Sequence, residues 1–423
     1  MNIQEKDKKY IWHPFTQMKT AGNHLVAVKG EGAYIYTEDD TKILDAVSSW
    51  WTTNHGHAHP YIAEALYQQF KTLEHVIFAG FTHPKAVELA ERIVGKLPYL
   101  HKVFFSDNGS TAVEIGIKMA FQYWFNKGES KTKMIAFKNA YHGDTFGAMS
   151  VGGRSDFNKA FFPFLFDVEY IDLPTKGNEE KSIEQLKNAL KNNDVAAFIF
   201  EPLVQGAAGM LMYEPSILNE LVGIAKANNV LVIADEVMTG FGRTGKLFAT
   251  DYIENKPDIV TLSKGLTGGV MALGLTVCTD EIYNAFLSDD HSKTFFHGHS
   301  FTANPLACAA SCASLDLFEK KETWKSIDMI VDSHQTFGDI IKKNSLLKEV
   351  RQTGTILAME FKTAESTSYF NSLRDELYAY FLERNILLRP LGNVLYILPP
   401  YCIKKKELEI IYKEIEAFLN KKS

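Results

Sequence analysis

Residues 230–264 read VLVIADEVMTGFGRTGKLFATDYIENKPDIVTLSK and contain two short apolar runs, Val230–Asp235 and Ile259–Ser263. Neither run alternates apolar and polar residues, which is the pattern of β-strands covered on both faces. An aspartate ends the first run, and Lys264 directly follows the second. Ligands of open α/β sheets bind outside the carboxyl ends of the strands. This stretch therefore predicts a carboxylate and an amine at one ligand-binding edge.

The pattern continues outward from this stretch. Similar runs cover Lys102–Ser106, Lys133–Phe137 and Val195–Glu201, and helical stretches at Thr111–Phe125 and Ser216–Asn228 separate them. Strands that alternate with helices indicate an α/β fold with a mostly parallel, doubly wound sheet and helices on both faces.

The two ends of the chain differ from its middle. The first fifty residues contain short strand-like pieces (LVAVKG and AYIYTED), and the last hundred carry helices with short runs at Ile386–Pro390 and Val394–Pro399. We therefore expect a smaller α+β lobe built from both ends. The expected division is 1–50 and 326–423 for the small domain and 51–325 for the large one.

Composition excludes several classes of protein. Of 423 residues, 46% are hydrophobic and 23% charged, which argues against a disordered, collagen-like or disulfide-stapled chain. A net charge of −6 without a basic block argues against a nucleic-acid partner. The four cysteines form no CxxC pair, the first residues lack an apolar signal, and no long apolar run occurs. We expect a cytoplasmic protein without membrane insertion.

Three strand ends carry groups that suit one cofactor, pyridoxal phosphate (PLP). Lys264 is suited to form a Schiff base with its aldehyde, and Asp235 to pair with its pyridine nitrogen. The Gly109 and Ser110 amides, at an expected helix start, are suited to hold its phosphate. Tyr141, after the Lys133–Phe137 run, is placed to stack on the ring. Each feature alone also has an ordinary structural explanation, so the prediction depends on the combination.

The motifs around these residues resemble a known family. IADEVMTGFGRTGKLFA, from Ile233, followed by PDIVTLSKGLTGG, from Pro257, closely resembles the signature of class III aminotransferases, which are fold type I PLP enzymes. The resemblance extends over nearly the whole chain, through SDNGSTAVE, YHGDTFGAMSVGG, EPLVQGAAGM and FFHGHSFTANPLACAA. It implies the same roles for Asp235 and Lys264.

Three further segments resemble class members that act in biotin biosynthesis: IWHPFTQM near the start, SSWWTTNHGH from Ser48, and RPLGNVLYILPPY from Arg389. This resemblance implies ping-pong transfer of an amino group from S-adenosylmethionine to 8-amino-7-oxononanoate, giving 7,8-diaminononanoate. It implies that Lys264 shuttles the proton, that Arg389 binds the acceptor's carboxylate, and that Trp50 and Tyr141 line its hydrocarbon chain.

The family also implies a homodimer with shared active sites. Gly298, His299 and Ser300 match the segment that reaches the neighbouring subunit's phosphate and substrate. A monomer is then expected to be inactive.

Phe15 departs from the pattern of the adenosylmethionine-using members, which usually carry tyrosine there. Lysine-using relatives commonly have phenylalanine, so L-lysine stays open as the donor, as does another class III omega-aminotransferase activity. The Trp50–Trp51 pair favours S-adenosylmethionine. Met238, where ornithine-type members tend to have glutamine, argues against an ornithine-type substrate.

Two rival hypotheses come from other classes. His55, His57 and His59, with His297 and His299 further on, suggest an HxH metal hydrolase. Gly56 and Pro60 predict a turn, and no third carboxylate or cysteine ligand stands at a recognisable spacing, so we expect no metal ligand. A non-enzymatic binding module on a PLP fold is expected to lose the lysine or the aspartate, and both are present. The motif residues Glu201, Gln205 and Arg243 are equally compatible with contact and with a supporting role.

Overall fold

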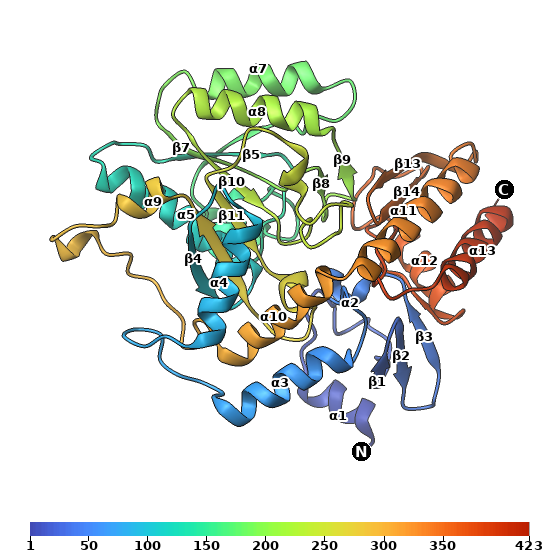
Figure 1. Ribbon diagram of the computed structural model, residues 1–423. Coiled ribbons are helices and arrows are strands. Elements are labelled where there is room, and N and C mark those ends of the chain that lie inside the picture. The colour runs from blue at the N-terminus through green and yellow to red at the C-terminus, as the bar shows by residue number, and fades with distance from the viewer. Residues whose placement is uncertain (423) are drawn as a thin grey trace.

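A seven-stranded sheet forms the centre of the large domain in the computed structural model, which describes residues 1–422 (Figure 1). Its strands, in spatial order, are β4 (Lys102–Ser106), β12 (Gly274–Cys278), β11 (Ile259–Leu262), β10 (Leu231–Asp235), β7 (Val195–Phe200), β5 (Lys133–Phe137) and β6 (Val168–Ile171). Only β12 runs against the others, because it pairs antiparallel with both β11 and β4. The predicted mostly parallel sheet is confirmed.

All five predicted strands are present in this sheet, each within one residue of its expected ends. Sequence patterns did not predict β6 or β12. The predicted helices also form, as α5 (Gly109–Asn126) and α8 (Pro215–Ala227). The Asn108 side chain begins α5 by accepting the Thr111 amide at 3.0 Å, and Pro215 occupies the first turn of α8, where a missing N–H costs nothing.

Alternate residues of the central strands enter two cores. Phe137 and Phe200 belong to one cluster with buried residues of α4 (Pro84–Lys96), α7 (Glu179–Ala189), α8 and α10 (Pro305–Phe318). Ala136 and Ile199 belong to the other cluster, with α5 and α6 (Phe146–Val151). The sheet is therefore covered by helices on both faces, as its apolar strands require.

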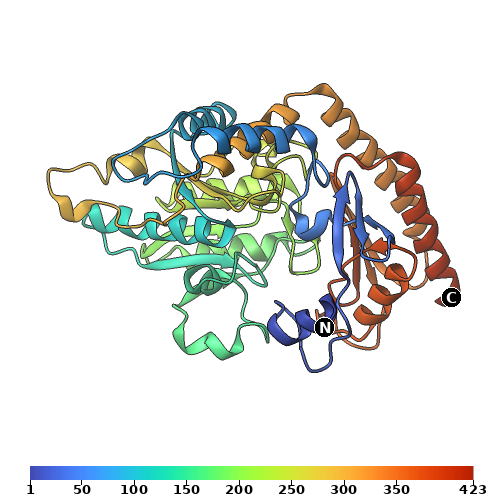
Figure 2. The same ribbon diagram turned by 90° about the horizontal axis from the view of Figure 1, so that it is seen from below.

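Both chain ends build the small lobe, in which the blue strands lie beside the red helices (Figures 1 and 2). One sheet has the order β1 (Ala27–Glu31), β2 (Tyr34–Thr37), β3 (Lys42–Asp45) and β15 (Ile386–Leu387), and β15 runs parallel to β3. A second sheet contains β13 (Leu347–Thr353), β14 (Ile356–Phe361) and β16 (Val394–Ile397). The helices of the small lobe are α11 (Lys321–Ile341), α12 (Leu373–Leu382) and α13 (Lys405–Lys422).

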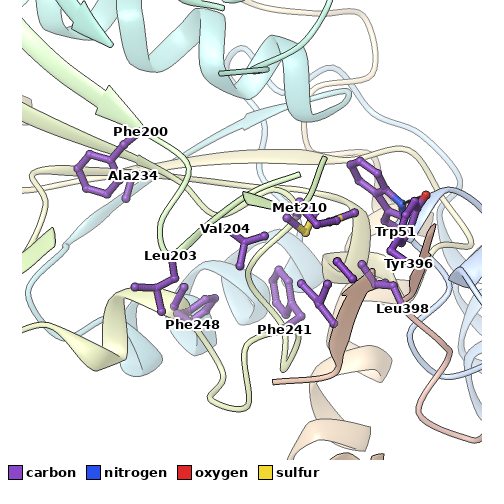
Figure 3. Packing of buried hydrophobic residues seen from close by; sticks show 14 of the residues in the cluster. Trp51, Phe200, Leu203, Val204, Met210, Ala234, Phe241, Phe248, Tyr396 and Leu398 are labelled. Atoms are coloured by element: carbon purple, nitrogen blue, oxygen red, sulfur yellow. Dashed lines mark hydrogen bonds between the residues drawn. The ribbon is translucent and has the colours of Figure 1, made fainter. Parts of the chain in front are cut away.

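The predicted domain boundaries stay predictions. Residue 50 lies in α2 (Ser48–Trp51) and residue 325 lies in α11, so neither falls in a loop. The largest apolar cluster also runs from the central sheet into the small lobe (Figure 3), where Trp51 and Tyr396 lie at one end and Phe200 and Ala234 at the other.

The remaining elements connect these layers. They are the helices α1 (Ile3–Tyr10), α3 (Pro60–Thr72) and α9 (Asp280–Asn284), the short strands β8 (Val204–Gln205) and β9 (Leu211–Met212), and the 3₁₀ turns η1 (Lys159–Phe164), η2 (Ala249–Tyr252), η3 (Lys264–Thr267) and η4 (His291–Lys293). Within residues 1–422, no helix has the length and apolar character needed to cross a membrane.

Candidate active site

A cavity of about 1420 Å³ opens at the carboxyl ends of the parallel strands. Eight of the residues predicted from sequence line it: Phe15, Trp50, Gly109, Ser110, Tyr141, Asp235, Lys264 and Arg389. They come from widely separated parts of the chain and from both lobes. The other three predicted residues, Gly298, His299 and Ser300, do not line this cavity.

Asp235 is the last residue of β10, and its carboxylate is nearly inaccessible to solvent. His142 Nδ1 donates to Asp235 Oδ2 at 2.7 Å, and Oδ1 accepts the Val237 amide at 3.1 Å and the Thr261 hydroxyl at 3.2 Å. Three donors therefore fix the carboxylate in place. His142 was not predicted from sequence, because it lies 93 residues earlier in a loop.

Lys264 lies two residues after the end of β11 and has a φ of +44°, in the left-handed region that non-glycine residues seldom adopt. Its ammonium lies 4.9 Å from the centre of the Trp51 ring. Loss of solvation lowers the pKa of this amine, although the charges of Asp235 and Glu201 oppose the shift. A lowered pKa makes the neutral, nucleophilic form of a lysine more accessible.

Glu201 is a second buried acid in the cavity wall, at the end of β7. Its two oxygens accept the Tyr141 amide at 3.0 Å and the Gly206 amide at 2.9 Å. Burial raises the pKa of this carboxyl to about 7, despite the opposing charge of His142. Glu201 therefore holds the loop that carries Tyr141 against the end of β7.

The start of α5 faces the cavity with unpaired backbone donors, because the first amides of a helix have no intrahelical partner. The Ser110 hydroxyl lies 2.8 Å from the Thr145 hydroxyl and accepts the Thr145 amide at 3.0 Å. Gly143 has a φ of +124°, and a Cβ there would lie 2.5 Å from Ser110 Cβ. Glycine at this position lets two backbone segments meet around a space suited to an anion.

Arg389 supplies the cavity with a positive charge from the small lobe. Its guanidinium lies 4.5 Å from the centre of the Trp50 ring and, within residues 1–422, makes no ion pair or hydrogen bond. Phe15 packs against Trp50 with a centroid separation of 5.7 Å. This part of the cavity combines an apolar wall with an uncompensated cation.

Asp45 shapes the turn that presents Trp50. It accepts the Val47 and Ser49 amides at 3.0 and 2.7 Å and also bonds His57 Nε2 at 2.8 Å. Within α2, Ser48, Ser49 and Trp51 all have positive φ. Strained backbone of this kind clusters at ligand-binding sites, and here a buried carboxylate holds it.

Sequence reasoning missed an aromatic rim at the cavity mouth. Phe157 lies 6.3 Å from Phe15, 4.9 Å from Tyr369 and 5.2 Å from Phe370, measured between ring centroids. Trp51 is a further cavity residue whose role was not predicted, and its Nε1 donates to the Tyr396 hydroxyl at 2.8 Å. The adjacent tryptophans in the sequence were the available signal for Trp51.

Tyr141 presents its ring to the cavity and donates its hydroxyl to Asp144 at 3.1 Å. Burial and the neighbouring Asp144 charge raise the pKa of the phenol, so it stays protonated at neutral pH. The Tyr141 hydroxyl is therefore directed by a carboxylate that also lines the cavity.

Residues 285–304 form an arm that extends away from the body of the protein in both views (Figures 1 and 2). The predicted residues Gly298, His299 and Ser300 lie on this arm. His299 Nδ1 is 3.5 Å from Asp107, and its Nε2 is 3.1 Å from His297 Nε2. The flanking side chains of Phe296 and Phe301 are 74% and 60% exposed, which is the exposure expected of a segment that covers another surface.

His55, His57 and His59 of the rival metal hypothesis do not converge on one point. His55 is buried against Phe318 and contacts the Ser314 hydroxyl at 3.0 Å, whereas His57 contacts Asp45. Burial lowers the pKa of His55 to about 3. His59 precedes α3, and its ring lies 6.2 Å from that of His55.

Two other motif residues are supports rather than cavity residues. The buried Arg243 donates to the Pro399 carbonyl at 2.8 Å and to Asn54 at 2.7 Å, so it joins the segment after α2 to the segment after β16. Gln205 donates to the Lys138 carbonyl at 3.2 Å.

The cavity fits pyridoxal phosphate by the chemistry of its donors. It offers a fixed carboxylate for the pyridine nitrogen (Asp235), an amine of lowered pKa for the aldehyde (Lys264), and helix amides beside Ser110 for the phosphate. The close approach at Gly143 closes the phosphate end of this arrangement.

Comparison with known proteins agrees with this geometry. The family model described as Aminotransferase class-III matches residues 16–419. The chain belongs to the class III aminotransferases, which are PLP-dependent enzymes that act on small molecules.

Individual relatives and solved structures resemble the chain more specifically than the family model does. The adenosylmethionine-8-amino-7-oxononanoate aminotransferase of Synechococcus elongatus is 46% identical over 420 residues, covering 97% of this chain and 98% of the relative. The enzyme of that name from Methanocaldococcus jannaschii has a solved structure with a TM-score of 0.93 and 37% identity, covering 98% of each chain. A PLP-bound amine transaminase from an uncultivated Pseudomonas species has a TM-score of 0.91 and 29% identity, covering 97% of this chain and 98% of the other.

Proposed function

We propose that this enzyme transfers an amino group from S-adenosylmethionine to 8-amino-7-oxononanoate, giving 7,8-diaminononanoate in biotin biosynthesis. The observation that carries the proposal is the uncompensated guanidinium of Arg389 beside Trp50 in an aromatic cavity. A long-chain keto acid has an apolar chain and a terminal carboxylate, and these two features match the Trp50–Phe15 wall and the arginine fork. The names of the full-length relatives support the same substrates.

Each cavity residue then has a distinct task. Bound PLP supplies an electron sink for the carbon that exchanges its amino group. Asp235 keeps the pyridine nitrogen protonated, and the Gly109 and Ser110 amides hold the phosphate. Lys264 holds the cofactor covalently and, once released, moves the proton at the reacting carbon.

The substrates bind in turn to the same cavity, so we expect ping-pong kinetics. Arg389 binds the acceptor's carboxylate, and Trp50 and Phe15 exclude water from its chain. The ring of Tyr141 covers the cofactor ring. Its hydroxyl, which donates to Asp144, faces the place where the amino group of each substrate binds.

L-lysine is a second candidate donor. Phe15 contributes a ring but no hydroxyl to the cavity wall, whereas a tyrosine there could bond a polar donor. The experiment follows the visible absorbance of the holoenzyme during separate additions of S-adenosylmethionine and L-lysine without acceptor. Loss of absorbance with S-adenosylmethionine alone supports the proposal. Loss with lysine alone changes the donor, and no loss with either contradicts the substrate class.

We further propose a homodimer in which the arm completes the neighbouring site. Gly298, His299 and Ser300 lie outside the cavity of their own chain, on a segment with exposed apolar side chains. In the dimer, His299 and Ser300 contact the partner's phosphate and Gly298 lines its substrate channel. Mixing a Lys264→Ala chain with a Ser300→Trp chain tests this arrangement. Shared sites restore part of the activity, whereas sites confined to one chain leave the mixture inactive.

A further inference from the structure

Asp7, His13 and His24 form a cluster in the N-terminal segment, and none of them lines the cavity. His13 Nε2 lies 3.0 Å from Asp7 Oδ1, and His24 Nδ1 lies 3.1 Å from Asp7 Oδ2. The two imidazole rings stack at 3.8 Å. Asp7 belongs to α1, whereas both histidines come from the extended chain that follows it.

The cluster has the composition and spacing of a metal site. The candidate ligand atoms all lie within 4.8 Å of one another, and no other group of three His, Cys, Asp or Glu residues in the described chain meets this condition. Bonds of about 2 Å at tetrahedral angles separate ligand atoms by about 3.3 Å. Asp7 Oδ2 lies 3.0 Å from His13 Nε2 and 3.1 Å from His24 Nδ1, and both separations are close to that value.

The three side chains are also reachable by an ion. Asp7, His13 and His24 are 19%, 26% and 35% exposed, so they are sheltered but open to solvent on one side. Two imidazoles and one carboxylate with a water molecule in the fourth position suit Zn²⁺ and the neighbouring first-row ions better than Ca²⁺ or Mg²⁺.

We propose that Asp7, His13 and His24 bind one divalent transition-metal ion of the Zn²⁺ class. The ion closes residues 7–24 into a ring that contains Phe15. Phe15 is the only residue of this segment that lines the cavity, and its φ of +51° requires support from its surroundings. The site is thus structural, and it fixes the segment that presents Phe15 to the substrate. It does not depend on the proposed reaction.

The test uses holoenzyme treated with a chelator, desalted and titrated with zinc chloride against a chromophoric competitor. We expect one ion per chain, and we expect Asp7→Asn and His24→Gln to weaken binding on the order of tenfold or more. His101→Gln is the matched control, because His101 faces the single carboxylate of Asp280 at 3.6 Å and should leave zinc affinity unchanged. Absence of zinc binding up to millimolar concentration, or wild-type affinity in His24→Gln, would overturn the proposal.

A second measurement on the wild-type chain does not depend on how the variants fold. Lys19 lies inside the proposed ring and is exposed, so trypsin can cleave after it. Zinc should slow cleavage at this bond in the wild-type chain. Equal cleavage rates with and without zinc in the wild type contradict the ring.

Discussion

His142 donates Nδ1–H to Asp235 at 2.7 Å, and its Nε2 is buried without a partner among residues 1–422. The carboxylate proposed to pair with the cofactor nitrogen is therefore held from behind by the His142 imidazole. Because this hydrogen bond fixes its orientation, the Asp235 carboxylate directs its negative charge into the cavity. Other catalytic sites use an aspartate–histidine hydrogen bond to hold side chains in one orientation in the same way.

Replacing His142 with phenylalanine should weaken catalysis while leaving the fold intact. A lost hydrogen bond to a charged group costs about 1.5–3 kcal/mol, so kcat/KM should fall about tenfold to a hundredfold. His334→Phe is the matched control, because His334 is a buried histidine that bonds Tyr412 and does not line the cavity. Equal kcat/KM in His142→Phe and the wild type contradicts the positioning role.

Lys264→Ala should abolish turnover while the protein still folds and binds the cofactor noncovalently. Its amine is the group proposed both to hold the cofactor and to move the proton. Lys138→Ala is the control, because Lys138 also follows a parallel strand but pairs with Asp172 at the surface. Turnover measures the activity of each variant, and circular dichroism measures its folding. Normal turnover by Lys264→Ala would contradict the catalytic role assigned to Lys264.

Arg389→Ala should raise the KM for the acceptor about tenfold to a hundredfold, with a smaller effect on the donor half-reaction, since one carboxylate partner worth about 1.5–3 kcal/mol is lost. Arg384→Ala is the control and should leave the KM for the acceptor unchanged, because Arg384 lies over the Tyr380 ring at 3.6 Å and outside the cavity. An unchanged KM for the acceptor in Arg389→Ala would show that the acceptor's carboxylate binds at another residue.

Phe15→Tyr should improve the use of S-adenosylmethionine if the missing hydroxyl limits donor recognition. The ring already lies in the cavity wall against Trp50, so the substitution adds one oxygen without moving the wall. The measurement is kcat/KM for S-adenosylmethionine and for L-lysine in both chains. An unchanged ratio shows that residue 15 does not select the donor.

Glu201→Gln should flatten the dependence of stability on pH. Burial raises the pKa of this carboxyl from 4.5 to about 7, so the folded state holds a proton that the unfolded state has already released between these values. Stability therefore falls as pH rises through this window, by up to about 1.4 kcal/mol per pH unit for each such proton.

Glu236 carries a second carboxyl with a pKa raised to about 7 by burial, so Glu236→Gln should flatten the curve in the same sense. Urea unfolding at several pH values measures both slopes. Wild-type slopes in both variants contradict this origin of the pH dependence.

Apolar runs in the sequence predicted the strands, because strand formation depends mainly on residues that are close together in the chain. The apolar runs that became β10 and β11 placed Asp235 and Lys264 at one edge, because strand ends in a parallel sheet share that edge. The antiparallel β12 was missed, and inside the protein its Thr276 hydroxyl donates to the Ala112 carbonyl.

Contacts between distant segments could not be derived from pattern. His142 meets Asp235 through a loop, and Arg389 meets Trp50 from the far end of the chain. The family resemblance named these residues or their neighbours, but only the folded chain shows which of them touch. The Asp7–His13–His24 cluster had no signal in sequence spacing.

The bond from Trp51 to Tyr396 spans 345 residues, and β3 pairs with a strand that begins at residue 386. During synthesis, the tryptophan wall of the cavity is complete only after nearly the entire polypeptide has left the ribosome. The large sheet can form earlier, because its strands end at residue 278. A nascent or prematurely terminated chain is thus expected to have a folded sheet but no competent pocket, which ties activity to full-length translation.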